Sequence, residues 1–188
     1  MQAIEALLQR HSARALGEPA PDDAALALMF QSAAHAPDHG RLRPWRFILI
    51  RHDARGQLGE LLAEHLRRTR QPISEEALER ERQKAFRAPV IIAVAAIIAL
   101  NAKVPPIEQV LSAGAAAYGL MLAAFSLGFN AMWKTGGPAY DETVKSALGL
   151  AQKDALVGFL YVGTEERSAQ PPAQPAWQQF VQEWQRPG

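Results

Sequence analysis

The chain has 188 residues, of which 48% are hydrophobic and 21% are charged, and its formal net charge is +1. These values are typical of a compact globular protein, and we expect residues 1–188 to form a single domain. The near-neutral charge gives no general attraction to nucleic acid or to acidic membranes. The absence of cysteine excludes a disulfide framework, an iron–sulfur cluster, a thiolate zinc site and a cysteine nucleophile.

The N-terminal stretch predicts a short helix at Ala3–Leu8. Glu5 interrupts its apolar residues and no small-residue cleavage site follows, so the pattern is not that of a signal peptide. A second helix is expected at Asp22–Ala34, whose first turn carries two aspartates. Pro37–Pro44 predicts a loop, because two prolines and a glycine interrupt any periodicity.

The middle of the chain combines buried-strand patterns with exposed-helix patterns. Trp45–Ile50 is β-branched and aromatic and predicts a strand. Asp53–Arg70 and Ser74–Arg87 are rich in charge and predict exposed helices. Val90–Ala99 is an apolar run rich in Ile and Val, which favours a strand covered on both faces.

The second half begins with a long apolar segment at Pro105–Gly128, ended by a glycine as at a helix C-cap. Its uncharged part is long enough to span a membrane, but Ala, Gly and Ser dilute it, and we expect a core helix of a cytoplasmic protein. The further elements expected are a strand at Phe129–Lys134, a helix at Asp141–Leu148, a strand at Ala155–Gly163, a proline-rich connector at Gln170–Pro175 and an amphipathic helix at Trp177–Trp184.

These elements together predict an α+β fold with a central mixed sheet of about four strands wrapped by helices. The long helix also carries a run of small residues at Ser112–Ala117, followed by Gly119. Such a run lets another backbone approach closely. Packing against the helix's own sheet and packing against a second copy of the chain in a symmetric dimer both satisfy the pattern.

Several common motifs are excluded by single residues. His35 and His39 have the spacing of a zinc pair on a helix, but Pro37 disfavours helix between them. Gly128–Thr135 ends in Lys-Thr like a phosphate loop, but Trp133 stands where that loop needs its second glycine. The hydrolase pattern GxSxG and the dinucleotide pattern GxGxxG are both absent.

Three patches remain as candidate binding residues. The first is Arg10–Arg14, whose two guanidinium groups and hydroxyl suit a phosphate. The second is the loop Ala36–Trp45, which carries Asp38, His39, Arg41 and Arg43. The third is Trp133–Gly137, at the end of a predicted strand.

In this order and at these distances, the three patches resemble the FMN-dependent nitroreductase family, in particular its compact YdjA-type branch. Further motifs extend the resemblance over nearly the whole chain. They are Arg-x-Ser after the first helix, Ala-Pro-x-His before Pro-Trp, Phe-Arg-Ala-Pro at Phe86–Pro89, Ser-Ala-Gly at Ser112–Gly114 and Gly-Phe-x-x-x-Trp-Lys-Thr-Gly at Gly128–Gly136.

The resemblance implies a homodimer with FMN at the subunit interface. It implies a ping-pong transfer of electrons from NAD(P)H to nitroaromatic, quinone or similar electron-poor acceptors, with the chemistry carried by FMN rather than by a catalytic side chain or a metal. The implied cofactor-binding residues of one subunit are Arg10, His11, Ser12, Arg14, Trp133, Lys134, Thr135 and Gly136, with His35 and His39 supplied by the partner subunit and Arg43 in the same loop as His39. The stretch Ala123, Ala124, Phe125, Ser126, Leu127 and Gly128 resembles the segment assigned to the nicotinamide cofactor and fits a core helix equally well.

The loop departs from the family pattern, because Arg41 and Arg43 stand where the wider family has Asn and Gln. An arginine near the pyrimidine end of a flavin would favour the anionic reduced form and raise the potential. An arginine that points into solvent is the other reading. Two alternative functions stay open: other FMN chemistry on the same scaffold, such as dehydrogenation or dehalogenation of a small ring, and a non-catalytic flavin-binding dimer.

Overall fold

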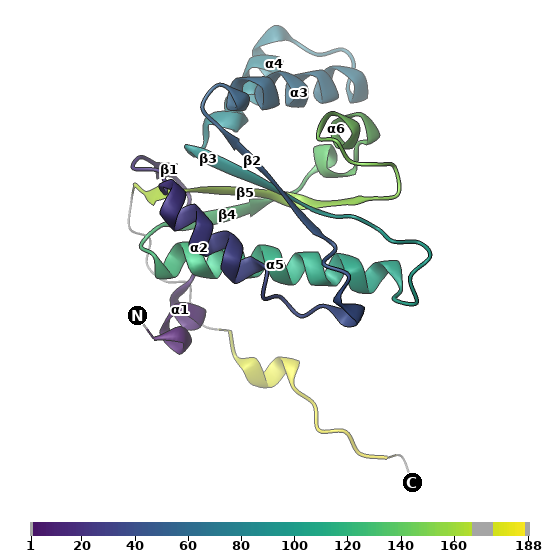
Figure 1. Ribbon diagram of the computed structural model, residues 1–188. Coiled ribbons are helices and arrows are strands. Elements are labelled where there is room, and N and C mark those ends of the chain that lie inside the picture. The colour runs from purple at the N-terminus through teal and green to yellow at the C-terminus, as the bar shows by residue number, and fades with distance from the viewer. Residues whose placement is uncertain (1, 167–174, 187–188) are drawn as a thin grey trace.

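The computed structural model describes residues 2–166 and 175–186. At its centre lies a sheet in which β2 (Trp45–Arg51), β3 (Val90–Ala96), β5 (Ala155–Glu165) and β4 (Asn130–Lys134) lie side by side in that order (Figure 1). A short strand, β1 (Leu16–Gly17), pairs with the end of β5. The sheet therefore has five strands where the sequence predicted about four. Two-residue β1 carries no periodic pattern that could have predicted it.

The strand pairs of this sheet are antiparallel. The sheet is therefore antiparallel rather than mixed as predicted. In the described residues, the parallel pairing is an isolated bridge between Ser12 and Ala131, which lays the segment before β1 alongside β4. This bridge positions the first candidate patch beside the third.

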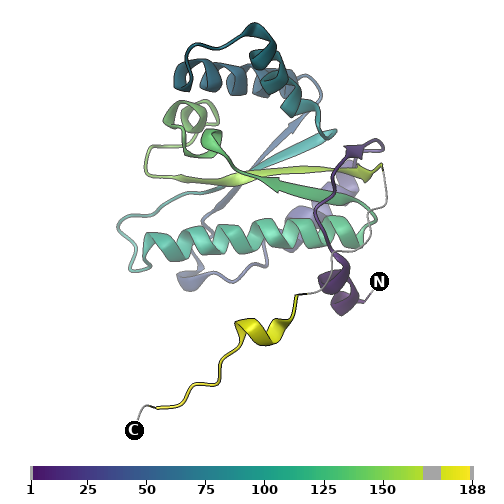
Figure 2. The ribbon, with the colours of Figure 1, turned by 180° about the vertical axis from the view of Figure 1, so that it is seen from behind.

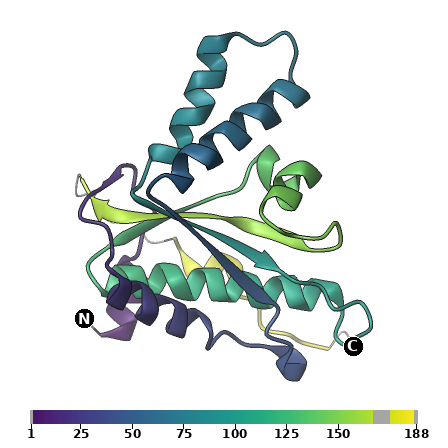
Figure 3. The same ribbon diagram turned by 45° about the horizontal axis from the view of Figure 1, so that its top comes forward.

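Alternation of side chains along each strand divides the core into two layers. Ile91 on β3 and Phe159 on β5 belong to the cluster beneath α3 (Ala54–Thr69), α4 (Glu75–Arg82) and α6 (Glu142–Ala147). Ile92 and Leu160 belong to the cluster on the other face, which α2 (Asp23–Ala33) and α5 (Pro106–Ser126) cover. The two helical layers lie on opposite sides of the sheet (Figure 1). Helices α3 and α4 form a hairpin that stands up from it (Figure 3).

Helix α5 is long and apolar enough to cross a membrane, judged by its length and composition alone. It nevertheless runs along the sheet as a core helix (Figure 2). Ala113, Ala116, Ala117 and Leu120 are completely buried. The opposite side of the helix leaves Ile107, Leu111 and Tyr118 exposed.

The remaining elements are short. They are α1 (Ala3–Gln9), η1 (His39–Arg41), η2 (Gln83–Phe86), η3 (Gly137–Tyr140) and η4 (Trp177–Phe180). The predicted helix at Ser74–Arg87 is thus α4 followed by the tighter turn η2.

Most predicted bounds differ by one or two residues, and two differences are larger. β3 ends at Ala96 rather than Ala99, because side chains replace the strand ladder there: Asp154 accepts the Ile98 N–H and Gln109 accepts the Ala99 N–H. The helix predicted at Trp177–Trp184 was wrong. Only the turn η4 forms, followed by extended backbone with exposed side chains, since this segment contacts no sheet or helix that could cover its apolar face. Most of the predicted connector Gln170–Pro175 lies outside the described residues.

Candidate functional site

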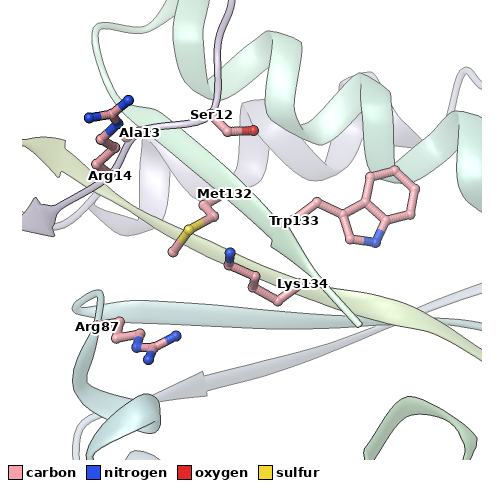
Figure 4. A pocket seen from close by; sticks show the side chains of 7 residues that line it. All are labelled: Ser12, Ala13, Arg14, Arg87, Met132, Trp133 and Lys134. Atoms are coloured by element: carbon pink, nitrogen blue, oxygen red, sulfur yellow. The ribbon is translucent and has the colours of Figure 1, made fainter. Parts of the chain in front are cut away.

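A cavity of about 370 Å³ opens where the segment before β1, the end of β4 and the start of β3 meet (Figure 4). Arg14, Arg87 and Lys134 reach it from these three segments, and Ser12 adds a hydroxyl. Its remaining lining residues are Ala13, Met132 and Trp133. We call it the cationic cavity. Within the described parts of the chain, no carboxylate pairs with Arg14, Arg87 or Lys134, so the three charges are available to an anion.

The alternation of β4 decides which of its side chains serve this cavity. Met132 packs in the layer of α3 and α6, and Lys134, two residues on, lies on the same side of the strand. Trp133 packs in the α5 layer, where its indole N–H donates to the Val157 carbonyl at 3.3 Å. In Figure 4 the indole accordingly points away from Arg14 and Arg87.

A partly buried polar cluster holds the segment that carries Ser12 and Arg14. His11 Nε2 lies 3.0 Å from Glu165 Oε2, and Asn130 Nδ2 donates to the same oxygen at 3.0 Å. Asn130 is almost fully buried on β4, and Glu165 ends β5. The imidazole of His11 therefore faces this cluster rather than the cationic cavity.

A second cavity, of about 640 Å³, shares Arg87 and Lys134 with the cationic cavity. We call it the larger cavity. Its floor includes Phe159 and Tyr161 of β5, and its walls come from the α3–α4 hairpin and from the turn that follows β4. The turn after β4 contributes Thr135, Gly136, Gly137 and Pro138. The α3–α4 hairpin contributes His65, Leu66 and Ile73 among others, and η2 contributes Lys84. The two cavities adjoin at the shared cations.

Tyr161 is 5% exposed at the floor of the larger cavity. Burial raises the pKa of its phenol, against the opposing effect of the nearby Arg87 charge. The phenol is therefore neutral throughout the physiological range, and the floor of the cavity carries no negative charge there.

The loop of the second candidate patch lies against the first half of α5, away from both cavities of its own chain. Ser112 donates to the Pro37 carbonyl at 2.7 Å, and Asp38 accepts the Arg43 N–H at 2.7 Å. His39 Nδ1 lies 2.6 Å from Glu108 Oε2. The backbone of this loop is strained, since Arg41 and Arg43 have positive φ angles of 53° and 49°.

The sequence-derived residues thus fall into three groups. Ser12, Arg14, Trp133 and Lys134 line the cationic cavity, and Thr135 and Gly136 line the larger one. Arg10 lies outside both, with its guanidinium 5.5 Å from the Tyr118 ring centre, and His11 lies in the polar cluster. His35, His39 and Arg43 are exposed in or beside the loop on α5. Residues 123–128 form the end of α5 and its cap, where Ala124 is completely buried and Ser126, Leu127 and Gly128 are exposed.

Comparison with known proteins decides the family. The sequence model of the Nitroreductase family matches residues 7–164. The chain belongs to the Nitroreductase family. It is 36% identical over 169 residues to the Escherichia coli K12 protein described as "Putative NAD(P)H nitroreductase YdjA", covering 90% of this chain and 91% of that one. A Haemophilus influenzae relative with the description "Putative NAD(P)H nitroreductase" is also 36% identical, over 90% of this chain and 92% of its own.

Solved structures share the nitroreductase fold. A nitroreductase-like protein from Bacillus cereus superposes with a TM-score of 0.83 at 19% identity, covering 99% of this chain and 97% of that one. A Desulfovibrio desulfuricans structure, described as a nitroreductase family candidate in complex with FMN, superposes with a TM-score of 0.74 at 24% identity, covering 100% and 99%. The fold expected from the sequence is thereby confirmed.

Arg87 and His65 are lining residues that the sequence reasoning did not select. Arg87 stands in the Phe-Arg-Ala-Pro quartet, which was read as a resemblance but not as a binding site. A charged residue directly before a fully buried strand is the signal that could have found it. His65 sits in a charged helix pattern and carries no such signal.

Proposed function

We propose that the protein is a cytoplasmic FMN-dependent NAD(P)H oxidoreductase that reduces nitroaromatic, quinone or similar electron-poor acceptors. Its family membership supports this, as do the NAD(P)H nitroreductase descriptions of its relatives and the FMN complex of a structural neighbour. We propose that residues 1–188 act as one domain.

The observation that carries the proposal is the pair of adjoining cavities that share Arg87 and Lys134. FMN has a doubly charged phosphate at one end and a flat ring system at the other. The cationic cavity fits the first, since it is lined by three cations and a hydroxyl, and no carboxylate of the described residues pairs with these cations. The larger cavity fits the second, because at about 640 Å³ it has an aromatic floor and a wall of two glycines that lets a ring approach the backbone.

In this proposal each residue has a distinct task. Ser12, Arg14, Arg87 and Lys134 hold the phosphate, and the Thr135–Gly137 backbone lies against the ring. Tyr161, neutral because burial raises its pKa, gives the ring an uncharged floor. When bound, FMN would supply the redox chemistry, a two-electron transfer from the nicotinamide to the acceptor. The side chains bind, orient and shield the reactants from water.

We further propose that the active unit is a homodimer joined through α5. Ile107, Leu111 and Tyr118 form an exposed apolar stripe on that helix, spaced along one side of it. The loop with His39 and Arg43 packs on the same helix, so a dimer across α5 brings this loop toward the partner's FMN. Ala123–Gly128, at the end of α5, remains our candidate segment for the nicotinamide cofactor.

The test begins with the visible absorption spectrum of the purified protein supplied with FMN, recorded without oxygen before and after addition of NADPH or NADH. We expect flavin bands that bleach on addition. Bands that persist would favour other flavin chemistry, and a protein that takes up no FMN would contradict the proposal.

A comparison of FMN with riboflavin tests the role of the cationic cavity separately from that of the larger cavity. Riboflavin has the ring of FMN without its phosphate, so wild-type protein is expected to prefer FMN. In Arg87→Gln, the dissociation constant for FMN should rise about tenfold to a hundredfold, as expected for a lost charge-assisted contact, while that for riboflavin changes little. Arg67→Gln, on the exposed end of α3, is the matched control. If Arg87→Gln raised the dissociation constants for FMN and riboflavin equally, the phosphate would have to bind elsewhere.

A further inference from the structure

His65 is held in one orientation at the wall of the larger cavity. It lies on α3 with its side chain 12% exposed, and its Nδ1 lies 2.9 Å from Oδ2 of Asp141. Asp141 follows η3 directly and caps the N-terminus of α6. Because an ionised carboxylate only accepts hydrogen bonds, Nδ1 carries the proton of the neutral imidazole, and Nε2 is the atom that gains or loses one.

Asp141 is itself fixed and stays ionised. Arg68 Nη2 donates to its Oδ1 at 3.0 Å, and the Val144 N–H donates to the same oxygen at 3.0 Å. Burial alone would raise the pKa of Asp141, but the hydrogen bonds from Arg68, Val144 and His65 together hold it well below its usual value. The ionised carboxylate therefore holds the imidazole at its Nδ1.

The other nitrogen points along the cavity wall. Nε2 of His65 lies 2.8 Å from the position that a Cβ on Gly137 would occupy, so only glycine leaves room for the imidazole there. In the described part of the chain, no protein group forms a hydrogen bond with Nε2. Nε2 is not among the fully buried polar atoms without a partner in the described residues, so it keeps some accessible surface. His65, Gly136 and Gly137 all line the larger cavity, which makes this atom the candidate contact for a molecule bound there.

Further charged groups line the same cavity. Arg87 and Lys134 are among them, and Asp141 contacts His65 directly. The complete set of other titratable groups lining the cavity comprises Arg70, Arg80, Glu81, Lys84 and Tyr161. Arg80 and Lys84 are each paired with a glutamate, so their charges are partly compensated.

We propose that His65 is a catalytic proton donor to the acceptor, with Asp141 and Arg68 as its positioning residues. This inference rests on the proposed function and adds a side chain to a reaction that the sequence assigned to FMN alone. Reduction of a quinone to a hydroquinone consumes two electrons and two protons. Both electrons and one proton come as a hydride equivalent from the flavin reduced by NAD(P)H. The second proton leaves Nε2: the N–H bond of protonated His65 breaks, an O–H bond forms on the quinone oxygen, and neutral imidazole is reprotonated from solvent.

The test compares two acceptors on the FMN-loaded protein. Menadione, a quinone, takes electrons together with protons, whereas ferricyanide takes one electron and no proton. In His65→Gln, the rate with menadione should fall about a hundredfold or more, as for loss of a general acid, and the rate with ferricyanide should stay within twofold. The bleaching of the flavin by NAD(P)H should also be unchanged.

The two acceptors also separate proton transfer from a structural role for Asp141. In Asp141→Asn, the kcat with menadione should fall more than the rate with ferricyanide, because the imidazole loses the contact that orients it. An equal loss with both acceptors would assign Asp141 a structural role and overturn its positioning of His65.

A readout without turnover completes the test. In the ¹⁵N NMR spectrum of the oxidised, FMN-loaded protein, 4-nitrobenzoate added without NAD(P)H should shift the Nε2 resonance of His65. The resonances of the exposed His52 should not move.

The outcomes separate the two proposals. Equal activity of His65→Gln with both acceptors, or loss of both together with loss of FMN, would overturn the role of His65. Wild-type protein that binds no FMN would instead overturn the proposed function.

Discussion

His11 Nε2 and Glu165 Oε2 lie 3.0 Å apart, and this contact joins the segment after α1 to the last residue of β5. With Asn130 bound to the same carboxylate, it holds Ser12 and Arg14 at the cationic cavity. If the cationic cavity holds the FMN phosphate as proposed, His11 would position the residues that bind it rather than contact it directly. Such a role would explain why His11 lies within the Arg-x-Ser motif of the family resemblance although its imidazole does not face the cationic cavity.

Glu165→Ala is expected to weaken FMN binding from a distance. It leaves His11 and Asn130 without their shared partner, which costs about 1–3 kcal/mol and frees the segment that carries Ser12 and Arg14. We expect a fivefold or greater rise in the FMN dissociation constant, measured by quenching of flavin fluorescence. The neighbouring exposed Glu166→Ala is the control. Unchanged affinity in Glu165→Ala would show that the segment holds its place without the cluster.

Gly158→Ala should destabilise the fold strongly. Gly158 has a φ of 154°, and a Cβ there would collide with the indole of Trp133 and come within 2.9 Å of the Lys134 carbonyl. We expect a loss of about 2–4 kcal/mol in the free energy of unfolding by urea. Gly56→Ala on α3 is the control substitution, with the opposite expected effect. A Cβ on Gly56 meets nothing within 4 Å, and a glycine inside a helix lowers the free energy of unfolding by about 0.5–1 kcal/mol relative to alanine. That variant should be more stable than wild type.

Asp141 should make stability depend on acid pH. Its pKa lies well below the ordinary value of 3.8, so the folded state binds the proton more weakly than the unfolded chain does. The contribution of ionised Asp141 to the free energy of unfolding is therefore fully present above about pH 4.8, one unit over the pKa in the unfolded chain. This contribution is lost progressively as the pH falls below that value. Asp141→Asn should lower the free energy of unfolding by about 1–3 kcal/mol at pH 7. The difference from wild type, followed by urea unfolding, should shrink towards pH 3; a constant difference would contradict this account.

The arginine in the loop on α5 gives a prediction for the redox potential. If Arg43 of one subunit reaches the partner's flavin, its charge favours the anionic reduced form. Arg43→Gln should then lower the midpoint potential by on the order of 30 mV, which for a two-electron couple corresponds to about 1.4 kcal/mol. Spectroelectrochemical titration measures this, with Arg46→Gln on β2 as control. An equal potential in Arg43→Gln and wild type would place the side chain in solvent.

Leu111→Arg tests the dimer through α5. Leu111 is 64% exposed in the centre of the apolar stripe, so a charge there would be buried at the interface without a partner. We expect a monomer by light scattering and a loss of bound FMN, since His35 and His39 would no longer be supplied. Leu100→Arg, an equally exposed leucine outside α5, should remain dimeric. Wild-type protein that is already monomeric would reject the interface altogether.

Elements with a strong periodic pattern could be predicted from the sequence. The apolar run Val90–Ala96 and the helix Pro106–Ser126 bury nearly every residue on their inner faces, so hydrophobicity alone indicates them. Trp177–Trp184 was misread because an amphipathic pattern forms a helix only where something covers its apolar face. Extended backbone with exposed aromatic side chains is the result in the single chain.

The candidate site was only half accessible to sequence reasoning. Ser12, Arg14 and Lys134 stood in recognisable patches, and the bridge between Ser12 and Ala131 brings them together. The placement of Arg87 and His65 depends on tertiary contacts between segments far apart in the chain. His65 becomes noteworthy only through Asp141, 76 residues away, and no local pattern connects the two.

The sharing of Arg87 and Lys134 between two cavities has a consequence for how this protein can change over evolutionary time. The anchoring end is built from strand ends and the segment before β1, all tied to the core of the sheet. The α3–α4 hairpin, by contrast, supplies most of the outer wall of the larger cavity and stands away from the sheet (Figure 3). Under the proposed function, mutations in the hairpin would therefore exchange one acceptor for another while FMN stays in place. New substrates would become reachable by changing one supersecondary unit.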